Sequence, residues 1–98
     1  MENKNNMYET LFVVDVKDGE EIAKETVAKF TEVIAANATV DSVDEWGKRR
    51  FAYPIDYKWE GYYTLVNFTA PPEFPAELRR LFGIDEKIMR FIVTRREA

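Results

Sequence analysis

Residues 7–36 read MYETLFVVDVKDGEEIAKETVAKFTEVIAA, and a change of periodicity inside this stretch decides the fold. Its first part, residues 7–16, alternates between two sides as a strand does. One side carries Thr10, Phe12, Val14 and Val16, and the other carries Leu11 and Val13. A strand that is apolar on both sides indicates a central position in a sheet, or a second face that meets a partner.

A helix is expected over residues 20–36, because apolar residues recur there on one face at intervals of about 100°. Asp18 is the expected N-cap, since its carboxylate could accept free backbone N–H groups of the first turn. Glu20 and Glu21 are favourably placed at this positive end of the helix dipole. Asn37 is the expected terminator.

Residues 40–57 and 61–70 contain short apolar alternations that are typical of a long hairpin. Its turn is expected near Lys58–Gly61, with a bulge at Gly47 and an edge position at Pro54. The sequence leaves open which hairpin aromatics belong to the core and which to an interface, in particular Trp46, Tyr57 and Trp59.

Two prolines, Pro71 and Pro72, end the hairpin, and a second helix is expected over residues 74–82 with Gly83 as its cap. Residues 88–94 then form the last strand. One of its sides carries Met89, Phe91 and Val93, and the other carries Ile88, Arg90 and Ile92.

The order of these elements predicts an α+β protein with the ferredoxin-like β-α-β-β-α-β arrangement, a four-stranded antiparallel sheet with two helices on one face. We expect residues 7–98 to form this single domain and residues 1–6 to be a flexible N-terminal extension. Because the helices cover only one face, apolar side chains on the other face should form a docking site for a partner. These are Leu11, Val13, Leu65, Ile88 and Ile92, with Arg90 at the margin.

Composition removes much of enzyme chemistry. The 98 residues include no Cys and no His, so thiolate nucleophiles, imidazole bases and soft-metal sites are absent. The carboxylates do not have the spacing of a calcium loop. We therefore expect no enzyme, no metal or other cofactor and no small-molecule substrate. No segment has the pattern of a signal peptide or the length of a membrane span, so a cytoplasmic protein is expected.

A net charge of −4 argues against nucleic-acid binding, but the charge is unevenly distributed. Residues 1–45 hold four basic and eleven acidic groups, whereas residues 46–98 hold ten and seven. Three consecutive cations, Lys48, Arg49 and Arg50, lie among aromatic residues. Such cations can neutralise RNA phosphates beside rings that stack on bases. They can equally be charges that deter pairing at an exposed edge strand, and the sequence leaves both interpretations open.

The run GKRRFAYPI at residues 47–55 resembles the signature of the bacterial small-subunit ribosomal protein S-six family. That signature is a glycine, a basic cluster, an apolar residue, then Ala-Tyr-Pro and an aliphatic residue. The pair Tyr8-Glu9, the run Gly61-Tyr62-Tyr63 and the basic, apolar residues 88–96 are also similar to the family, so the resemblance covers residues 7–98. The chain departs from the family in having Phe51 where Leu is commoner and six residues before Met7. It also ends at Ala98, whereas some relatives carry longer tails.

The resemblance implies a structural protein of the bacterial small ribosomal subunit, without catalysis. It implies pairing with ribosomal protein S-eighteen and binding to the central domain of small-subunit ribosomal RNA. The candidate RNA contacts are Lys48, Arg49, Arg50, Arg95 and Arg96. The candidate partner contacts are Leu11, Val13, Leu65, Ile88, Arg90 and Ile92. Tyr53 and Pro54 are expected to set the shape of the motif.

Two other classes share this topology. A stand-alone RNA-recognition motif needs stacking aromatics on its third strand, but Thr64 stands where one of them is required, and Glu60 precedes Gly61. An acylphosphatase-like enzyme needs a loop that cradles an anion after the first strand, but residues 15–19 are acidic there. The RNA-recognition module remains the alternative to the ribosomal role.

Overall fold

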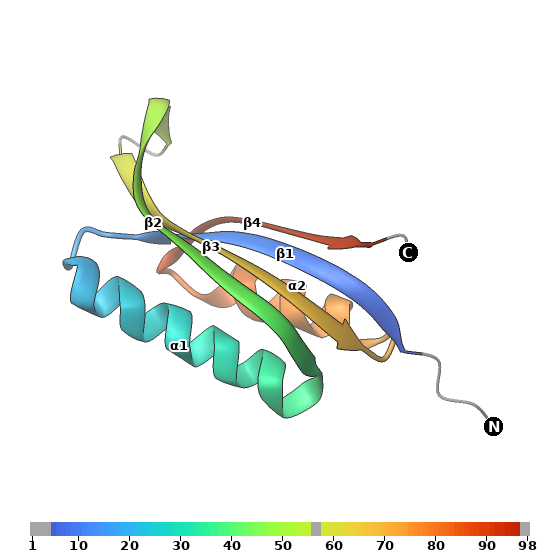
Figure 1. Cartoon of the computed structure of the whole chain (residues 1–98). Coiled ribbons are helices and arrows are strands. Elements are labelled where there is room, and N and C mark those ends of the chain that lie inside the picture. The colour runs from blue at the N-terminus through green and yellow to red at the C-terminus, as the bar shows by residue number, and fades with distance from the viewer. Residues whose placement is uncertain (1–4, 56–57, 97–98) are drawn as a thin grey trace.

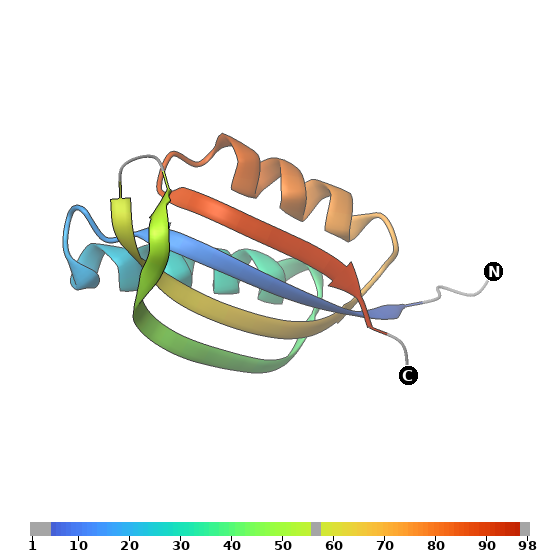
Figure 2. The same ribbon diagram turned by 90° about the horizontal axis from the view of Figure 1, so that it is seen from above.

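The computed structural model describes residues 5–55 and 58–96, and within them four strands and two helices follow the expected order. The elements are β1 (Asn6–Asp15), α1 (Glu20–Asn37), β2 (Thr39–Ile55), β3 (Lys58–Ala70), α2 (Phe74–Ile84) and β4 (Ile88–Arg95). All strand pairs are antiparallel, in the order β2-β3-β1-β4. Both helices lie on the same face of the sheet (Figures 1 and 2). The ferredoxin-like prediction is confirmed.

Strand β1 lies between β3 and β4, which explains why it is apolar on both faces. On the face toward the helices, Phe12 packs against Phe30 of α1 and Phe82 of α2, with ring centroids 4.7–6.0 Å apart in this trio. All three side chains are fully buried and form the centre of the core. The strand begins at Asn6, which pairs with Ala70, so pairing starts one residue earlier than expected. The remainder of the predicted extension, apart from Asn5, lies outside the described residues.

Helix α1 begins at Glu20, with Glu20 and Glu21 in its first turn as expected. The predicted N-cap is wrong: the cap is Gly19, whose φ of 98° requires a left-handed backbone, and no side chain caps the helix. A glycine takes this conformation without the strain that an aspartate would bring, so the turn is made one residue later than predicted. Asn37 is the last helical residue, and its Nδ2 donates to the Val33 carbonyl oxygen.

The β2–β3 hairpin is longer than predicted, because Ile55 still pairs with Lys58. The expected turn at Lys58–Gly61 is therefore wrong, and these residues belong to β3. The bulge at Gly47 is confirmed by a register shift between Glu45 and Gly47 and by a φ of 83° at the glycine. Beyond it the hairpin rises out of the plane of the sheet on the face away from the helices (Figure 1).

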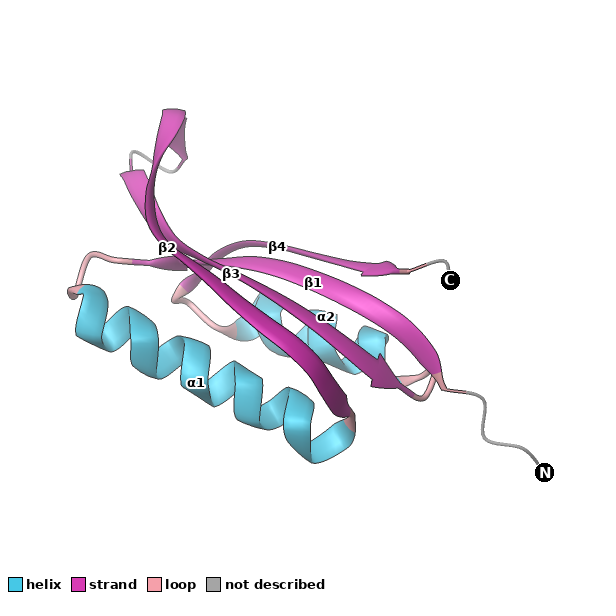
Figure 3. Ribbon diagram, in the orientation of Figure 1, coloured by secondary structure: helices cyan, strands magenta, loops and turns pink. Residues whose placement is uncertain are grey.

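Short loops join the second helix to its neighbouring strands (Figure 3). Pro75 lies in the first turn as expected, but Gly83 is inside α2 and Asp85 is the C-cap. A register shift in the β1–β4 ladder places Ile88 opposite Val14, on the side of the core. The expectation that Ile88 lies on the open face is therefore wrong, because a bulge reverses the alternation at the start of β4.

Candidate interaction site

The open face of the sheet carries an apolar hollow of about 510 Å³ over β1, β3 and β4. Two rows of paired residues build it: Ile92 beside Leu11 beside Leu65, and Arg90 beside Val13 beside Tyr63. The residues that line it are Leu11, Val13, Tyr63, Met89, Arg90, Phe91 and Ile92.

The exposure of these side chains differs widely. Ile92 is 54% exposed and Arg90 is exposed, whereas Val13 is buried and Leu11 is half-buried. Four of the predicted partner residues therefore meet in one place, and Leu65 lies beside them. Met89 and Tyr63 were not predicted to lie here. The β4 bulge that brings Met89 to this face leaves no mark in the sequence, whereas Tyr63 lies on the same side of β3 as Leu65 and follows from alternation.

Beside this hollow, the hairpin packs onto the sheet through aromatic residues. Phe51 is only 8% exposed and packs with its ring edge toward Tyr63, at 6.2 Å between centroids. It can lie this deep because Gly61 has no side chain: a Cβ there would lie 2.3 Å from Val13 Cγ1 and 3.0 Å from Phe51 Cζ. Trp46 stacks on Tyr63 at 6.1 Å. These four residues, Trp46, Phe51, Gly61 and Tyr63, fix the hairpin against the sheet.

The three consecutive cations lie on the part of β2 that rises from the sheet, and all are exposed. Lys48 Nζ is 3.9 Å from a carboxylate oxygen of Glu60, and the Arg50 guanidinium lies 5.3 Å from the centre of the Trp59 ring. Neighbouring residues of a strand point to opposite faces, so Arg49 shares a face with the buried Phe51 while the other two cations point away from it. The hairpin thus presents positive charge on both of its faces.

The two C-terminal arginines lie at the other end of the sheet. Arg95 pairs with Tyr8, and its Nη2 donates to the Asn6 side-chain oxygen at 3.2 Å. The backbone N–H of Arg96 donates to the Met7 carbonyl oxygen. Lys48 is aligned through β3 with Val14, six residues along β1 from Tyr8, which corresponds to roughly 20 Å. The five candidate RNA contacts therefore form two separate clusters.

The sequence left open whether three hairpin aromatics belong to the core or to an interface. Of these, Trp46 and Trp59 are 38% and 45% exposed, and Tyr57 lies outside the described residues.

A buried carboxylate joins the turn end of the hairpin to β1. Asp15, whose side chain is 3% exposed, forms an ion pair with Lys58 Nζ and accepts the backbone N–H of Lys17. Burial raises the pKa of the Asp15 carboxyl, but these hydrogen bonds and the charges of the two lysines outweigh it. The pKa is therefore held below its ordinary value of 3.8.

Asp15→Asn is expected to lower the free energy of unfolding at neutral pH by about 1 kcal/mol, a discounted value because Lys58 is 39% exposed. It should also reduce the loss of stability in acid. Since the folded-state pKa is depressed, the contribution is complete above the unfolded value of 3.8 and is lost as the pH falls through the folded-state pKa. Urea unfolding from about pH 6 to about pH 2 measures this slope. Asp18→Asn, an exposed neighbour in the same loop, is the control, and equal slopes in the two variants would contradict the assignment.

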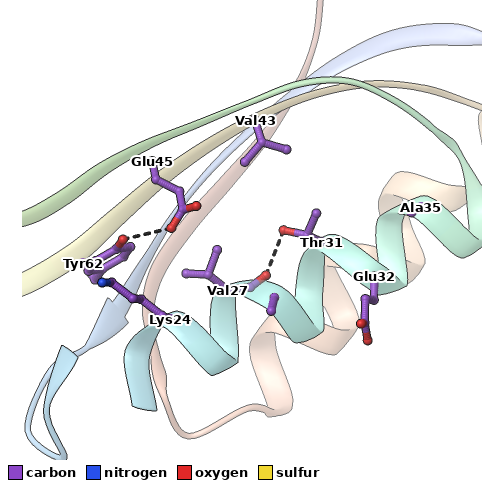
Figure 4. Close-up of a pocket in the computed structure, with 9 residues that line it drawn as sticks. Lys24, Val27, Thr31, Glu32, Ala35, Val43, Glu45 and Tyr62 are labelled. Atoms are coloured by element: carbon purple, nitrogen blue, oxygen red, sulfur yellow. Dashed lines mark hydrogen bonds between the residues drawn. The ribbon is translucent and has the colours of Figure 1, made fainter. Parts of the chain in front are cut away.

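A second hollow, of about 690 Å³, lies between α1 and β2 (Figure 4). Tyr62 donates its hydroxyl proton to Glu45 at one end, 2.9 Å between oxygens. Burial and the neighbouring Glu45 carboxylate raise the pKa of Tyr62 to about 12. The phenol is thus held as a neutral donor that ties β3 to the edge of the sheet.

Within residues 5–55 and 58–96, no three acidic side chains gather in a way that could hold a metal ion. In this same part of the chain, neither helix is long and apolar enough to cross a membrane.

The family model described as Ribosomal protein S6 matches residues 7–95, almost the whole length of the fold. The chain belongs to the ribosomal protein S-six family. Among its relatives, the Small ribosomal subunit protein bS6 of Clostridium perfringens strain SM101 is 53% identical over 91 residues, covering 92% of this chain and 96% of the relative. The corresponding protein of Clostridium novyi is 50% identical with the same coverage.

A solved structure of the S-six family has the same fold. The crystal structure of 30S ribosomal protein S6 from Thermotoga maritima superposes with a TM-score of 0.88 at 28% identity, covering 95% of this chain and 89% of that one. The resemblance seen in residues 47–55 is therefore confirmed, and this S-six chain is a ribosomal protein of the small subunit.

Proposed function

We propose that this S-six protein pairs with ribosomal protein S-eighteen through the open face of its sheet, and that the pair binds the central domain of small-subunit ribosomal RNA. The observation that carries the proposal is the apolar hollow on the open face. Contiguous apolar side chains with a charged rim are typical of a protein docking site. Leu11 and Ile92 would supply apolar area, and Arg90 would lie at the rim.

The aromatic residues of this face favour a protein partner over direct stacking on bases. A base-stacking platform needs ring faces that are free on the open side. Here Tyr63 lies on the open side, but its ring is half-buried and already packs against Trp46 and Phe51. The pattern's two aromatic positions on this strand correspond to Tyr62 and Thr64, and both side chains are buried on the side of the core. This arrangement weighs against the stand-alone RNA-recognition module.

RNA contact is proposed for the exposed cations. Lys48, Arg49 and Arg50 would neutralise phosphates from the raised part of the hairpin, and Arg95 and Arg96 would do so from the opposite end of the sheet. Phosphate contacts position a protein without reading bases, which suits a structural component. No catalytic step is part of this proposal.

Leu11→Asp combined with Ile92→Asp is expected to abolish copurification with S-eighteen. Two carboxylates would be buried without partners in the docked state, and such burial is strongly unfavourable. Copurification of tagged S-eighteen with the variant measures the effect, and circular dichroism checks the fold.

The matched control is Ala76→Asp combined with Ile84→Asp, which adds the same charge at exposed positions of α2. The control should pair normally. Normal pairing of the open-face variant would reject the proposed docking surface.

A further inference from the structure

The side-chain charge along strand β2 changes from negative to positive at Gly47. Residues 39–46 contain Asp41, Asp44 and Glu45 and no cation, whereas residues 47–55 contain three cations and no carboxylate. The basic half is the part that rises from the sheet, and RNA contact is proposed for it. The acidic half (residues 39–46) stays in the plane of the sheet, where three carboxylates would repel RNA phosphates. RNA is therefore not the ligand expected at the acidic half of β2.

The acidic half of β2 lies at the outer edge of the sheet. Strand β2 is last in the sheet order, and its described pairing is with β3 alone. The outer edge of such a strand presents backbone N–H and C=O groups that can pair with another extended chain. Val43, in the middle of the acidic half, is 40% exposed, although apolar residues at protected edges are normally replaced by charges or proline.

The hollow between α1 and β2 runs beside this edge (Figure 4). Its walls are apolar and built from short side chains of Val27, Ala28, Ala35 and Val43. Glu32 and Glu45 add two carboxylates, and Lys24 lies near Tyr62 at one end. A strand added along β2 would direct every second side chain toward α1, into this space, because side chains alternate along a strand.

We propose that the acidic half of β2 binds an extended, lysine- or arginine-bearing segment of a partner protein as a fifth strand, with its apolar side chains in the α1–β2 hollow. Strand addition supplies main-chain hydrogen bonds, and the hollow selects side chains at alternate positions. The carboxylates on both sides of the edge select a basic segment over a neutral or acidic one.

A second copy of this chain fits the edge less well. If two copies paired their β2 strands antiparallel, the acidic half of each strand would lie beside the basic half of the other, with favourable charge. However, the bulge and the positive φ at Gly47 separate the two halves, and the basic half leaves the sheet plane, so no straight edge joins them. The acidic half has a register shift of its own between Val40 and Ser42, so its regular edge beside the hollow is residues 42–45.

This inference does not depend on the S-eighteen contact. The edge and the hollow use no residue of the open-face hollow, which lies over β1, β3 and β4. A test without RNA and without S-eighteen therefore separates the two proposals, because disruption of one surface leaves the other intact.

The probe is an acetylated and amidated peptide of alternating Val and Lys, about eight residues long to match a short strand. Its titration into the full chain, followed by amide chemical shifts, is expected to perturb residues 39–46 and the side of α1 that faces β2. A peptide with Glu in place of Lys should give no such perturbation. Perturbations on the open face, or equal binding of both peptides, would overturn the proposal.

Matched charge reversals distinguish binding of the peptide in the α1–β2 hollow from its general attraction to an acidic protein. Glu32→Lys, within the hollow, is expected to weaken binding of the Val-Lys peptide about fivefold, whereas Glu25→Lys, exposed on α1 outside it, should change it by less than about twofold. Equal weakening would show that only net charge matters and would reject the site. If the free chain formed dimers in sedimentation and bound no peptide, the proposal would be rejected, and the ligand of this edge would be a second copy of the chain.

Discussion

Gly61→Ala is expected to lower the free energy of unfolding by about 2 kcal/mol, within the range of about 1–3 kcal/mol for overpacked sites. The added methyl group would lie 2.3 Å from Val13 Cγ1 and 3.0 Å from Phe51 Cζ. Val13 is buried and β-branched, so it cannot swing away as a long surface side chain would. Urea unfolding followed by circular dichroism measures the destabilisation.

A double-mutant cycle identifies the cause. Val13→Ala removes the shorter of the two contacts and leaves Phe51 Cζ at 3.0 Å, so Gly61→Ala should cost less in that background, with a coupling of about 1 kcal/mol or more. Gly83→Ala is the control, because nothing lies within 4 Å of its Cβ position and it is inside α2. That control should be neutral or stabilising by up to about 1 kcal/mol, since alanine is the better helix former. Additive costs at positions 13 and 61 would contradict the close contact.

The close approach at Gly61 also bears on function. Phe51 follows the basic residues directly and is held by this contact, so its packing sets the direction in which Arg49 and Arg50 leave the sheet. Displacement of Phe51 would leave the number of cations unchanged and alter only their placement. A glycine in the middle of a strand, which weakens the strand locally, is explained by this requirement.

The periodicity of the sequence was sufficient for the order of elements and for the centre of the core. Alternation in β1 and the apolar face of α1 predicted that Phe12 and Phe30 would be buried, and both are. Element ends were less predictable, because they depend on backbone conformation. The cap moved from Asp18 to Gly19 because the turn needs a positive φ. The hairpin turn moved because Lys58 pairs with Ile55 and its side chain pairs with Asp15.

The open face was predicted in outline, with errors of a specific kind. Leu11, Val13, Arg90 and Ile92 do meet, because simple alternation holds along the middle of β1 and β4. Ile88 faces the core instead, because a bulge reverses the alternation, and no residue type marks that bulge in the sequence. The α1–β2 hollow could not be predicted from one strand, since it depends on the spacing between α1 and the sheet.

RNA binding by the isolated chain is expected to be weak, and addition of S-eighteen should tighten it by about 50-fold, within the usual range of coupling between sites. The chain has eighteen acidic and fourteen basic groups, and its cations form two clusters at opposite ends of the sheet. Neither cluster alone can neutralise many phosphates. A basic partner docked on the open face between them would join the two into one positive surface and reduce the orientational cost of binding.

Gel-shift titration of a central-domain RNA fragment, with the chain alone and then with S-eighteen at fixed salt, measures this coupling. Serine at positions 48, 49 and 50 should weaken binding of the pair and reduce its salt dependence by roughly one counterion for each phosphate that is no longer neutralised. The same change at Lys17, Lys24 and Lys87 removes equal charge from exposed positions outside both clusters and should leave the salt slope nearly unchanged. Tight, sequence-selective binding by the chain alone would reject cooperative assembly, and it would instead favour an independent RNA-binding module on this fold.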